Sequence, residues 1–119
     1  MGKTHTRLVN KLVRQLKQSK EYDFVTKNQI YPLEPHKEDI GEVDVLAGNY
    51  HTGLLDTYEV KSSPNYLWKG REQLKKSKKY YSRFKYKKNR FFLLYKDYNG
   101  LETKLQIIPN GEGNRSRRK

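Results

Sequence analysis

An acid, Asp44, and the triplet Glu59-Val60-Lys61 stand in two stretches that alternate apolar and polar residues, as β-strands do. Side chains two residues apart point to the same face of a strand, so Glu59 and Lys61 share a face. If the two strands pair around a turn within residues 50–55, the carboxylates of Asp44 and Glu59 face each other. Such oxygen ligands suit Mg²⁺, for which Mn²⁺ can substitute. These residues therefore predict a divalent-cation site.

The chemistry of such a site follows from its ligands. A cation would be held by Asp44, Glu59 and the carbonyl oxygen of Val60, with water completing the octahedral shell. A bound metal lowers the pKa of water, and Lys61 beside it can hold that water or offset charge in the transition state. These are the parts of a phosphodiester hydrolase. The competing interpretation is a solvent-facing pair of Glu59 and Lys61.

Basic residues dominate the composition. The 119 residues include 26 Lys and Arg against 13 Asp and Glu, which gives a formal net charge of +13. This balance favours nucleic acid as partner, because cations near phosphates release counterions. A ribosomal-type or merely soluble basic protein is the alternative. A pure binding protein has no use for a buried acid pair, so Asp44 and Glu59 separate an enzyme from a non-catalytic nucleic-acid-binding protein.

Composition also bounds the class of protein. The absence of cysteine excludes disulfides and cysteine-based zinc sites. No apolar run approaches the ~20 residues that cross a bilayer, and the start has no signal-like apolar segment. We expect a soluble intracellular protein, in the cytoplasm or nucleoid, encoded by a cell or a virus. The length suits one domain over residues 1–109, and only 34% hydrophobic residues favours a homodimer that completes a lean core.

The elements that must position the site follow from hydrophobic periodicity. Spacings of three and four predict helices over residues 5–19 and 66–84. Alternating or apolar runs predict strands over residues 22–31, 42–49, 55–62, 90–96 and 101–108, with turns at 51–53 and 97–100. The first three strands form an antiparallel meander, and the second helix crosses from the third strand to the fourth. The expected fold class is α/β, a mixed sheet with helices packed against it.

Two segments are expected to be irregular. Residues 32–41 contain Pro32 and Pro35 and predict a loop beside the site that touches DNA. His36 in this loop, with Glu34, Glu38 and Asp39, is an alternative metal cluster. Residues 110–119 are rich in glycine and basic residues, which predicts a disordered tail.

The run G41-E-V-D44, followed by E59-V-K61-S-S and set in this order of elements, resembles the PD-(D/E)XK nuclease superfamily. The resemblance covers residues 5–96 and implies a restriction-endonuclease-like core and a Mg²⁺-dependent DNA endonuclease. It implies that Asp44 and Glu59 bind the metal and that Lys61 acts on the water. The family usually has proline where Val43 precedes Asp44.

Within that superfamily, size and charge make the chain similar to the small, dimeric Holliday junction resolvases of archaeal type. This implies cleavage of four-way junctions in DNA recombination; an endonuclease for linear, flap or nicked DNA is the alternative. The resolvases carry a glutamate three residues before a Leu-Val pair, where this chain has His5 before Leu8. His5 can bind a metal or a phosphate, or be an ordinary surface histidine. Gln73 matches a glutamine that orients the lysine or the water in some branches, with a solvated helix position as the alternative.

Basic side chains on the two predicted helices are candidates for phosphate contacts, with a solvated helix face as the alternative. Trp68 and the pair Tyr80-Tyr81 can stack on bases, although such residues more often belong to a core. Glu72 is expected on the surface, with Lys76 as its candidate partner. The residues predicted to bind DNA are Arg7, Lys11, Arg14, Ser62, Lys69, Lys75, Lys76 and Lys79.

Overall fold

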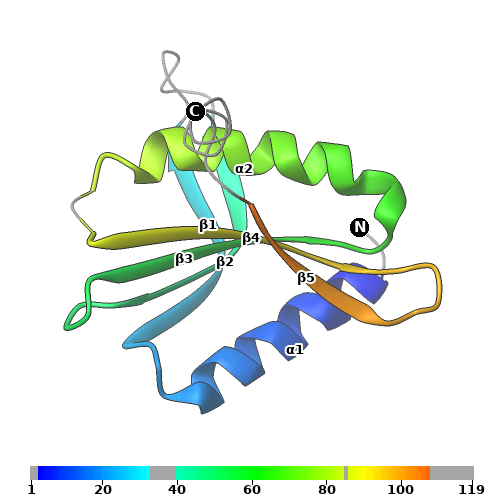
Figure 1. The fold of residues 1–119 in the computed structure, drawn as a ribbon, viewed down its shortest axis with the longest axis horizontal. Helices are drawn as coiled ribbons and strands as arrows, with labels where there is room; N and C mark the ends of the chain where they lie inside the picture. Colours follow the sequence, from blue (N-terminus) through cyan, green and yellow to red (C-terminus); the bar gives the residue numbers. More distant parts are fainter. Residues whose placement is uncertain (1–2, 33–39, 85, 108–119) are drawn as a thin grey trace, which may run out of the picture.

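A five-stranded sheet with one helix on each side makes up the protein, in a computed structural model that describes residues 3–32, 40–84 and 86–107 (Figure 1). The α/β class with a mixed sheet, expected from the sequence, is confirmed. The elements in chain order are α1 (Lys3–Ser19), β1 (Phe24–Pro32), β2 (Ile40–Asn49), β3 (Leu54–Lys61), a short 3₁₀ turn (Pro64–Tyr66), α2 (Leu67–Tyr81), β4 (Lys88–Lys96) and β5 (Glu102–Ile107). Within this described part, neither helix is long and apolar enough to cross a membrane.

The strands lie side by side in the order β1-β2-β3-β4-β5. The pairs β1–β2, β2–β3 and β4–β5 are antiparallel, so the predicted meander is confirmed. The pair β3–β4 is parallel, because α2 carries the chain back along the sheet between these strands.

Element boundaries differ from the expected ones where backbone pairing overrides local composition. β2 begins at Ile40, inside the expected loop 32–41, because Ile40 pairs with Pro32 of β1. The second helix ends at Tyr81, not at residue 84, because the next backbone N–H groups turn back to nearer carbonyls: that of Phe84 donates to Tyr81 at 3.2 Å. The remainder of the expected loop, 33–39 with its His36 cluster, and the expected tail 110–119 lie outside the described residues.

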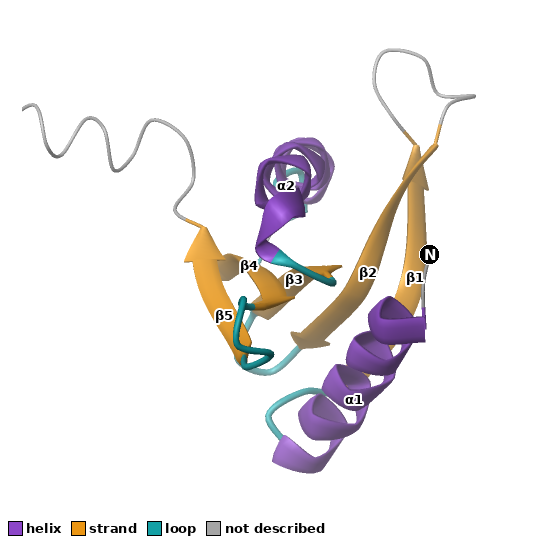
Figure 2. Ribbon diagram, turned by 90° about the vertical axis from the view of Figure 1, so that its right-hand side faces the viewer, coloured by secondary structure: helices purple, strands orange, loops and turns teal. Residues whose placement is uncertain are grey.

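The two helices cover opposite faces of the sheet (Figure 2). Leu8 and Leu12 of α1 belong to a buried cluster with Tyr58 and Val60 of β3. On the other face, Leu74 of α2 packs in a buried cluster with Phe91 and Leu93 of β4. Since neighbouring side chains of a strand alternate between faces, Glu59 and Lys61 point to the α2 side.

α2 approaches the sheet closely at Gly70 and Ser77, which are both buried. A Cβ atom on Gly70 would lie 2.5 Å from Cδ1 of Leu93 and 3.4 Å from Cγ of Lys61. The small residues therefore permit this close approach. They set α2 directly over the end of β3 that carries Lys61.

Candidate active site

The site is built where β2 and β3 separate. These strands pair from Asn49–Leu54 to Val45–Tyr58, and their described residues beyond that point do not pair with each other. In this register Asp44 and Glu59 come next. The backbone N–H of Val60 donates to Oδ2 of Asp44 at 2.7 Å, so a side chain takes the place of a backbone acceptor at the fork. Figure 2 shows β2 and β1 leaning away from β3 and β4.

Pairing with β1 is interrupted at the same residue. Lys27 pairs with Val45 and Gln29 pairs with Val43, whereas Asn28 between them has a φ of 56°. This left-handed conformation is uncommon outside glycine, and asparagine is among the residues that tolerate it best. Asp44 therefore stands at a break in the sheet on both of its sides.

A cavity of about 500 Å³ opens at this break. Its walls include all five residues predicted to be catalytic, and its size is within the ~300–1,000 Å³ usual for ligand sites. The five residues come from α1, β2, β3 and α2, far apart in the sequence. They are His5, Asp44, Glu59, Lys61 and Gln73.

Glu59 is the most buried of them, at 1% exposure. Burial, and then the neighbouring Asp44, raise the pKa of Glu59 to about 10, although the positive charge of Lys61 lowers it. In the protein alone, Glu59 is therefore protonated at neutral pH. Its Oε2 atom is buried without a hydrogen-bond partner, which leaves an oxygen acceptor at the cavity wall.

His5 lies in the cavity wall and not on the open surface. Its Nε2 atom is 3.4 Å from Oδ2 of Asp44, and the two side chains are 16% and 14% exposed. The first turn of α1 reaches Asp44 because the fork leaves the carboxylate accessible from that side. His5 is therefore not an ordinary surface histidine, and its binding of a metal or a phosphate stays a prediction.

Gln73 is not a solvated helix residue. It lines the cavity from α2, and its Oε1 atom is buried without a hydrogen-bond partner. The amide oxygen is thus an acceptor that a water molecule or a substrate can satisfy. The predicted role of Gln73 in orienting the lysine or the water stays a prediction.

Sequence reasoning missed Tyr31 as a member of the site. Its ring lines the cavity, is 3% exposed, and stacks on Tyr80 with centroids 5.3 Å apart. Burial, and then Glu59, raise the pKa of Tyr31 to about 12, so its hydroxyl stays protonated. A Cβ atom on Gly41, its cross-strand partner, would collide with this ring. A glycine inside a strand marks such a close approach, and Gly41 was the available signal.

Three acids line the cavity, namely Glu42, Asp44 and Glu59. No group of three or more His, Asp or Glu side chains suited to a metal ion occurs among residues 3–32, 40–84 and 86–107. Of these acids, Asp44 and Glu59 stay the predicted ligands of a cation. The carbonyl of Val60 stays a predicted ligand, because the hydrogen bond from the Val60 N–H to Asp44 does not test it.

The residues predicted to bind DNA lie on both sides of the sheet, because α1 and α2 cover opposite faces of it. Arg7 and Arg14 are exposed on α1, while Lys69 and Lys79 are exposed on α2. The two predicted basic faces therefore form two surfaces. Ser62 is half-buried directly after β3.

Three predicted DNA ligands have particular surroundings. Lys76 lines the cavity beside the candidate catalytic groups. Nζ of Lys11 is 2.7 Å from Glu102 of β5, which offsets its charge. Nζ of Lys75 is 3.4 Å from Glu72, so the expected pairing of Glu72 with Lys76 is wrong: the partner is three residues away.

The aromatic candidates differ in exposure. Tyr81 is 6% exposed and belongs to the core, which was the alternative to stacking on bases. Tyr80 packs between Tyr31 and Phe84. Trp68 is 65% exposed on the first turn of α2.

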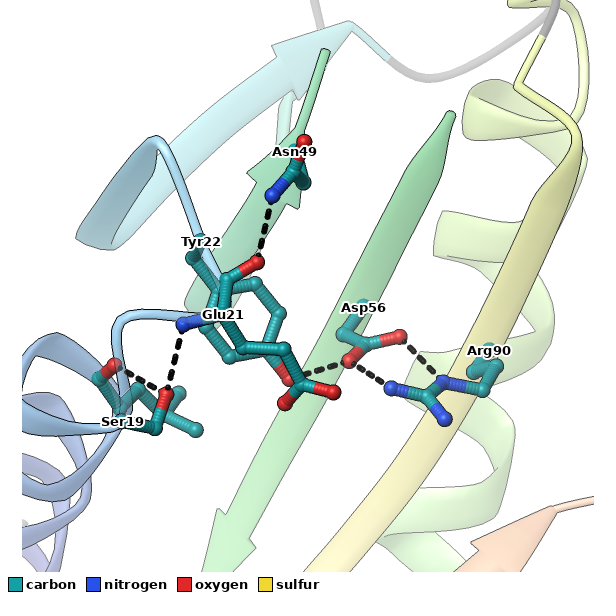
Figure 3. Close-up of polar contacts among 7 residues, drawn as sticks. Ser19, Glu21, Tyr22, Asn49, Asp56 and Arg90 are labelled. Carbon is teal, nitrogen blue, oxygen red and sulfur yellow. Dashed lines mark hydrogen bonds and ion pairs between the residues drawn. The ribbon is translucent and has the colours of Figure 1, made fainter. Parts of the chain in front are cut away.

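A second buried polar cluster lies on the α1 face of the sheet. Asp56 is fully buried and accepts two hydrogen bonds from Arg90, at 2.7 and 2.6 Å, and one from the Tyr22 hydroxyl at 2.5 Å (Figure 3). The nearby Glu21 carbonyl accepts from Asn49 at 2.7 Å. Both oxygens of the Asp56 carboxylate accept hydrogen bonds. The cluster therefore links Tyr22 of the α1–β1 connection to β3 and β4 of the sheet.

Comparison of the chain with protein-family models, with curated proteins and with solved structures finds no match in any of the three.

Proposed function

We propose that the protein is a Mg²⁺-dependent DNA endonuclease of the PD-(D/E)XK type, with a restriction-endonuclease-like core. The observation that carries the proposal is the meeting of Asp44, Glu59, Lys61 and Gln73 in one cavity at the fork of β2 and β3. Two neighbouring acidic side chains beside a lysine and an unsatisfied amide are a costly arrangement to bury. A hydrolytic site gives each of these groups a task.

The donor set fits a small divalent cation. Asp44 and Glu59 offer carboxylate oxygens, and the unpartnered Oε2 of Glu59 is the acceptor that a cation would satisfy. When bound, Mg²⁺ would supply Lewis acidity and lower the pKa of a coordinated water. Glu59 must lose its proton to act as a ligand, which couples cation affinity to pH.

The protein groups have separable roles. Lys61 offsets negative charge that develops on the phosphate or holds the attacking water. Gln73 accepts a hydrogen bond from that water and so orients it. His5 keeps the Asp44 carboxylate in position from the far side of the sheet. Exposed lysines of α2, with Lys76 at the cavity itself, would lead a phosphate backbone to the site.

Branched DNA is the first substrate to test, with a four-way junction as the leading choice. The net charge of +13 and the resemblance to small resolvases support this choice, and a homodimer would present two cavities for paired cuts. A nuclease for linear, flap or nicked DNA uses the same chemistry at a differently shaped surface.

The test is a cleavage assay at modest salt with a labelled four-way junction and a linear duplex of the same sequence. Paired symmetric cuts in the junction alone, in Mg²⁺ or Mn²⁺ but not in EDTA, would establish a resolvase. Cuts in both substrates would make it a general endonuclease.

Variants assign the activity to the cavity. Glu59→Gln keeps the shape of the side chain and is expected to abolish cleavage while DNA binding persists. Glu72→Gln removes one acid from the exposed side of α2, where Glu72 contacts only Lys75 among the ion pairs of the described residues, and is expected to cut normally. DNA binding with no cleavage in either metal would reduce the protein to a binding module and refute the proposal.

A further inference from the structure

Exposed aromatic side chains gather beside the start of α2. Trp68 is 65% exposed, Tyr66 is 49% exposed, and Tyr98 in the β4–β5 turn is 81% exposed. The Tyr98 hydroxyl donates to Oδ1 of Asn65 at 3.3 Å, so this turn lies against the segment that carries Tyr66 and Trp68. Figure 1 shows the turn and the first residues of α2 at the same end of the molecule. We call Tyr66, Trp68 and Tyr98 the aromatic surface.

The aromatic surface follows the candidate active site along the chain. β3 carries Glu59 and Lys61 on the cavity wall and leads directly into the 3₁₀ turn Pro64–Tyr66 and then α2. Oγ of Ser63 accepts the backbone N–H of Asn65 at 3.3 Å and fixes that turn. Tyr66 of the aromatic surface therefore lies only five positions after Lys61 of the cavity wall.

The surroundings of the surface favour an anionic partner. The first turn of α2 contains no acid, and Lys69 and Arg71 follow Trp68 with exposed side chains. Asp97, the acid next to Tyr98, already accepts the backbone N–H groups of Asn99 and Leu101 at 2.8 and 2.9 Å. A second copy of the chain would bring another charge of +13 toward the same place, whereas a polyanion complements it.

Exposed rings among cations match the chemistry of unpaired nucleotides. An unpaired base offers its flat face for stacking on an aromatic side chain, while in a duplex both faces are covered by neighbouring bases. Clustered exposed apolar groups with a polar rim mark interaction sites, in contrast to isolated ones. We propose that the aromatic surface binds single-stranded DNA by stacking of its unpaired bases, with Lys69 and Arg71 at the phosphates.

This inference rests on the proposed function only in placing the bound strand next to a cutting site. Base binding itself can be measured in EDTA, without cleavage. A protein that cuts no substrate but still binds unpaired bases would refute only the proposed nuclease function. A protein that cuts DNA but binds a strand with bases no more tightly than an abasic strand would refute this inference alone.

Trp68 is the only tryptophan of the chain, so its fluorescence reports directly on this surface. The full-length protein in EDTA is titrated with a thymidine oligonucleotide and with an abasic oligonucleotide of equal length and charge. We expect the thymidine strand to quench the fluorescence and to bind more tightly, since stacking brings the base against the indole ring. Equal binding of the two strands without quenching would overturn the inference.

Variants provide a second readout by fluorescence anisotropy of the labelled strand. Trp68→Ala and Tyr98→Ala should each weaken binding of the thymidine strand by about 5- to 100-fold and leave the abasic strand nearly unaffected. Tyr50→Ala is the matched control, because Tyr50 is 71% exposed on the β2–β3 turn at the opposite end of the sheet (Figure 1). Loss of a dimer in Trp68→Ala, with unchanged DNA binding, would instead make this surface a contact between two copies and overturn the inference.

Discussion

The backbone N–H of Val60 donates a hydrogen bond of 2.7 Å to Oδ2 of Asp44, across the point where β2 and β3 stop pairing. The carboxylate therefore has a structural task as well as a predicted chemical one. It satisfies a buried backbone donor that the neighbouring strand no longer reaches. At the same time it stands 3.4 Å from His5 and next to Glu59. Substitutions at Asp44 can separate these tasks.

Asp44→Ala should abolish cleavage and also lower the free energy of unfolding, by about 1–3 kcal/mol, because the Val60 N–H loses its acceptor. Asp44→Asn keeps an oxygen acceptor at that place and should unfold close to wild type while remaining inactive. Urea denaturation and the junction assay measure the two effects. Equal stability of Asp44→Ala and Asp44→Asn would show that the hydrogen bond contributes nothing to the fold.

Glu59 should make the protein less stable as pH rises. The pKa of Glu59 is near its ordinary 4.5 in the unfolded chain and about 10 in the folded protein, so the folded state binds more protons between these values. The free energy of unfolding then falls with increasing pH across this window, by up to about 1.4 kcal/mol per pH unit. Below the unfolded pKa, Glu59 is protonated in both states, so the free energy of unfolding no longer changes with pH through this group.

The comparison is between wild type and Glu59→Gln in EDTA, by urea denaturation at about pH 5 and about pH 9. Because glutamine does not titrate, the variant should lose much of the pH dependence and be the more stable protein at the higher pH. Parallel pH profiles of the two proteins would contradict the raised pKa. Added Mg²⁺ should restore stability to wild type at high pH, since the cation binds the ionised form of Glu59.

Removal of Arg90 should destabilise the fold without touching the cavity. Arg90→Ala leaves Asp56, which is fully buried, with only the Tyr22 hydroxyl as a donor. Breaking a buried ion pair typically costs about 3–5 kcal/mol, and the 27% exposure of Arg90 favours the lower end. Thermal or urea denaturation measures the loss.

The control for Arg90 is the double variant Asp56→Asn with Arg90→Gln, which removes both charges. It should be more stable than Arg90→Ala, because no uncompensated charge remains buried. Cleavage by the folded fraction should be unchanged, since the cluster and the cavity lie on opposite faces of β3. An unaltered midpoint for Arg90→Ala would refute the structural role of the cluster.

Gly70→Ala should lower both stability and activity, although alanine is the better helix former by about 1 kcal/mol. The new methyl group would meet Cδ1 of Leu93, whose side chain is fully buried and has little room to move. Relief of this contact shifts α2 away from Lys61, so we expect a net loss of about 1–3 kcal/mol and slower cleavage. Glu72→Ala on the exposed side of α2 is the control. Greater stability of Gly70→Ala than of wild type would show that α2 and Leu93 accommodate the methyl group.

Local patterns were sufficient for most of the fold. Each helix and strand was predicted within a few residues, because apolar spacing reports which face of an element is buried. Boundaries moved where long-range pairing decided them, as at Ile40, which is in β2 because Pro32 faces it across the strands. The turn at 51–53 and the β4–β5 turn followed from turn chemistry in the sequence.

The candidate site was predictable to the extent that strand alternation controls side-chain direction. Alternation put Glu59 and Lys61 on one face, and hairpin distance put Asp44 opposite Glu59. Tyr31 and Asn28 were beyond such reasoning, because their places depend on how the β1–β2 pair bends at the break around Asp44. The burial of Asp56 was also not predicted, because its hydrogen-bond partners Tyr22 and Arg90 are each 34 residues away in the sequence.

The sequence by itself determined the elements, the mixed sheet and the acid pair with its lysine, since all of these depend on periodicity and short spacings. Only the tertiary structure decided that β2 and β3 separate, that His5 reaches Asp44 through this fork, and that the basic faces of α1 and α2 lie on opposite sides of the sheet. These relationships join residues far apart in the chain, and their free energy comes from burial and hydrogen bonds that form only when the whole sheet is assembled.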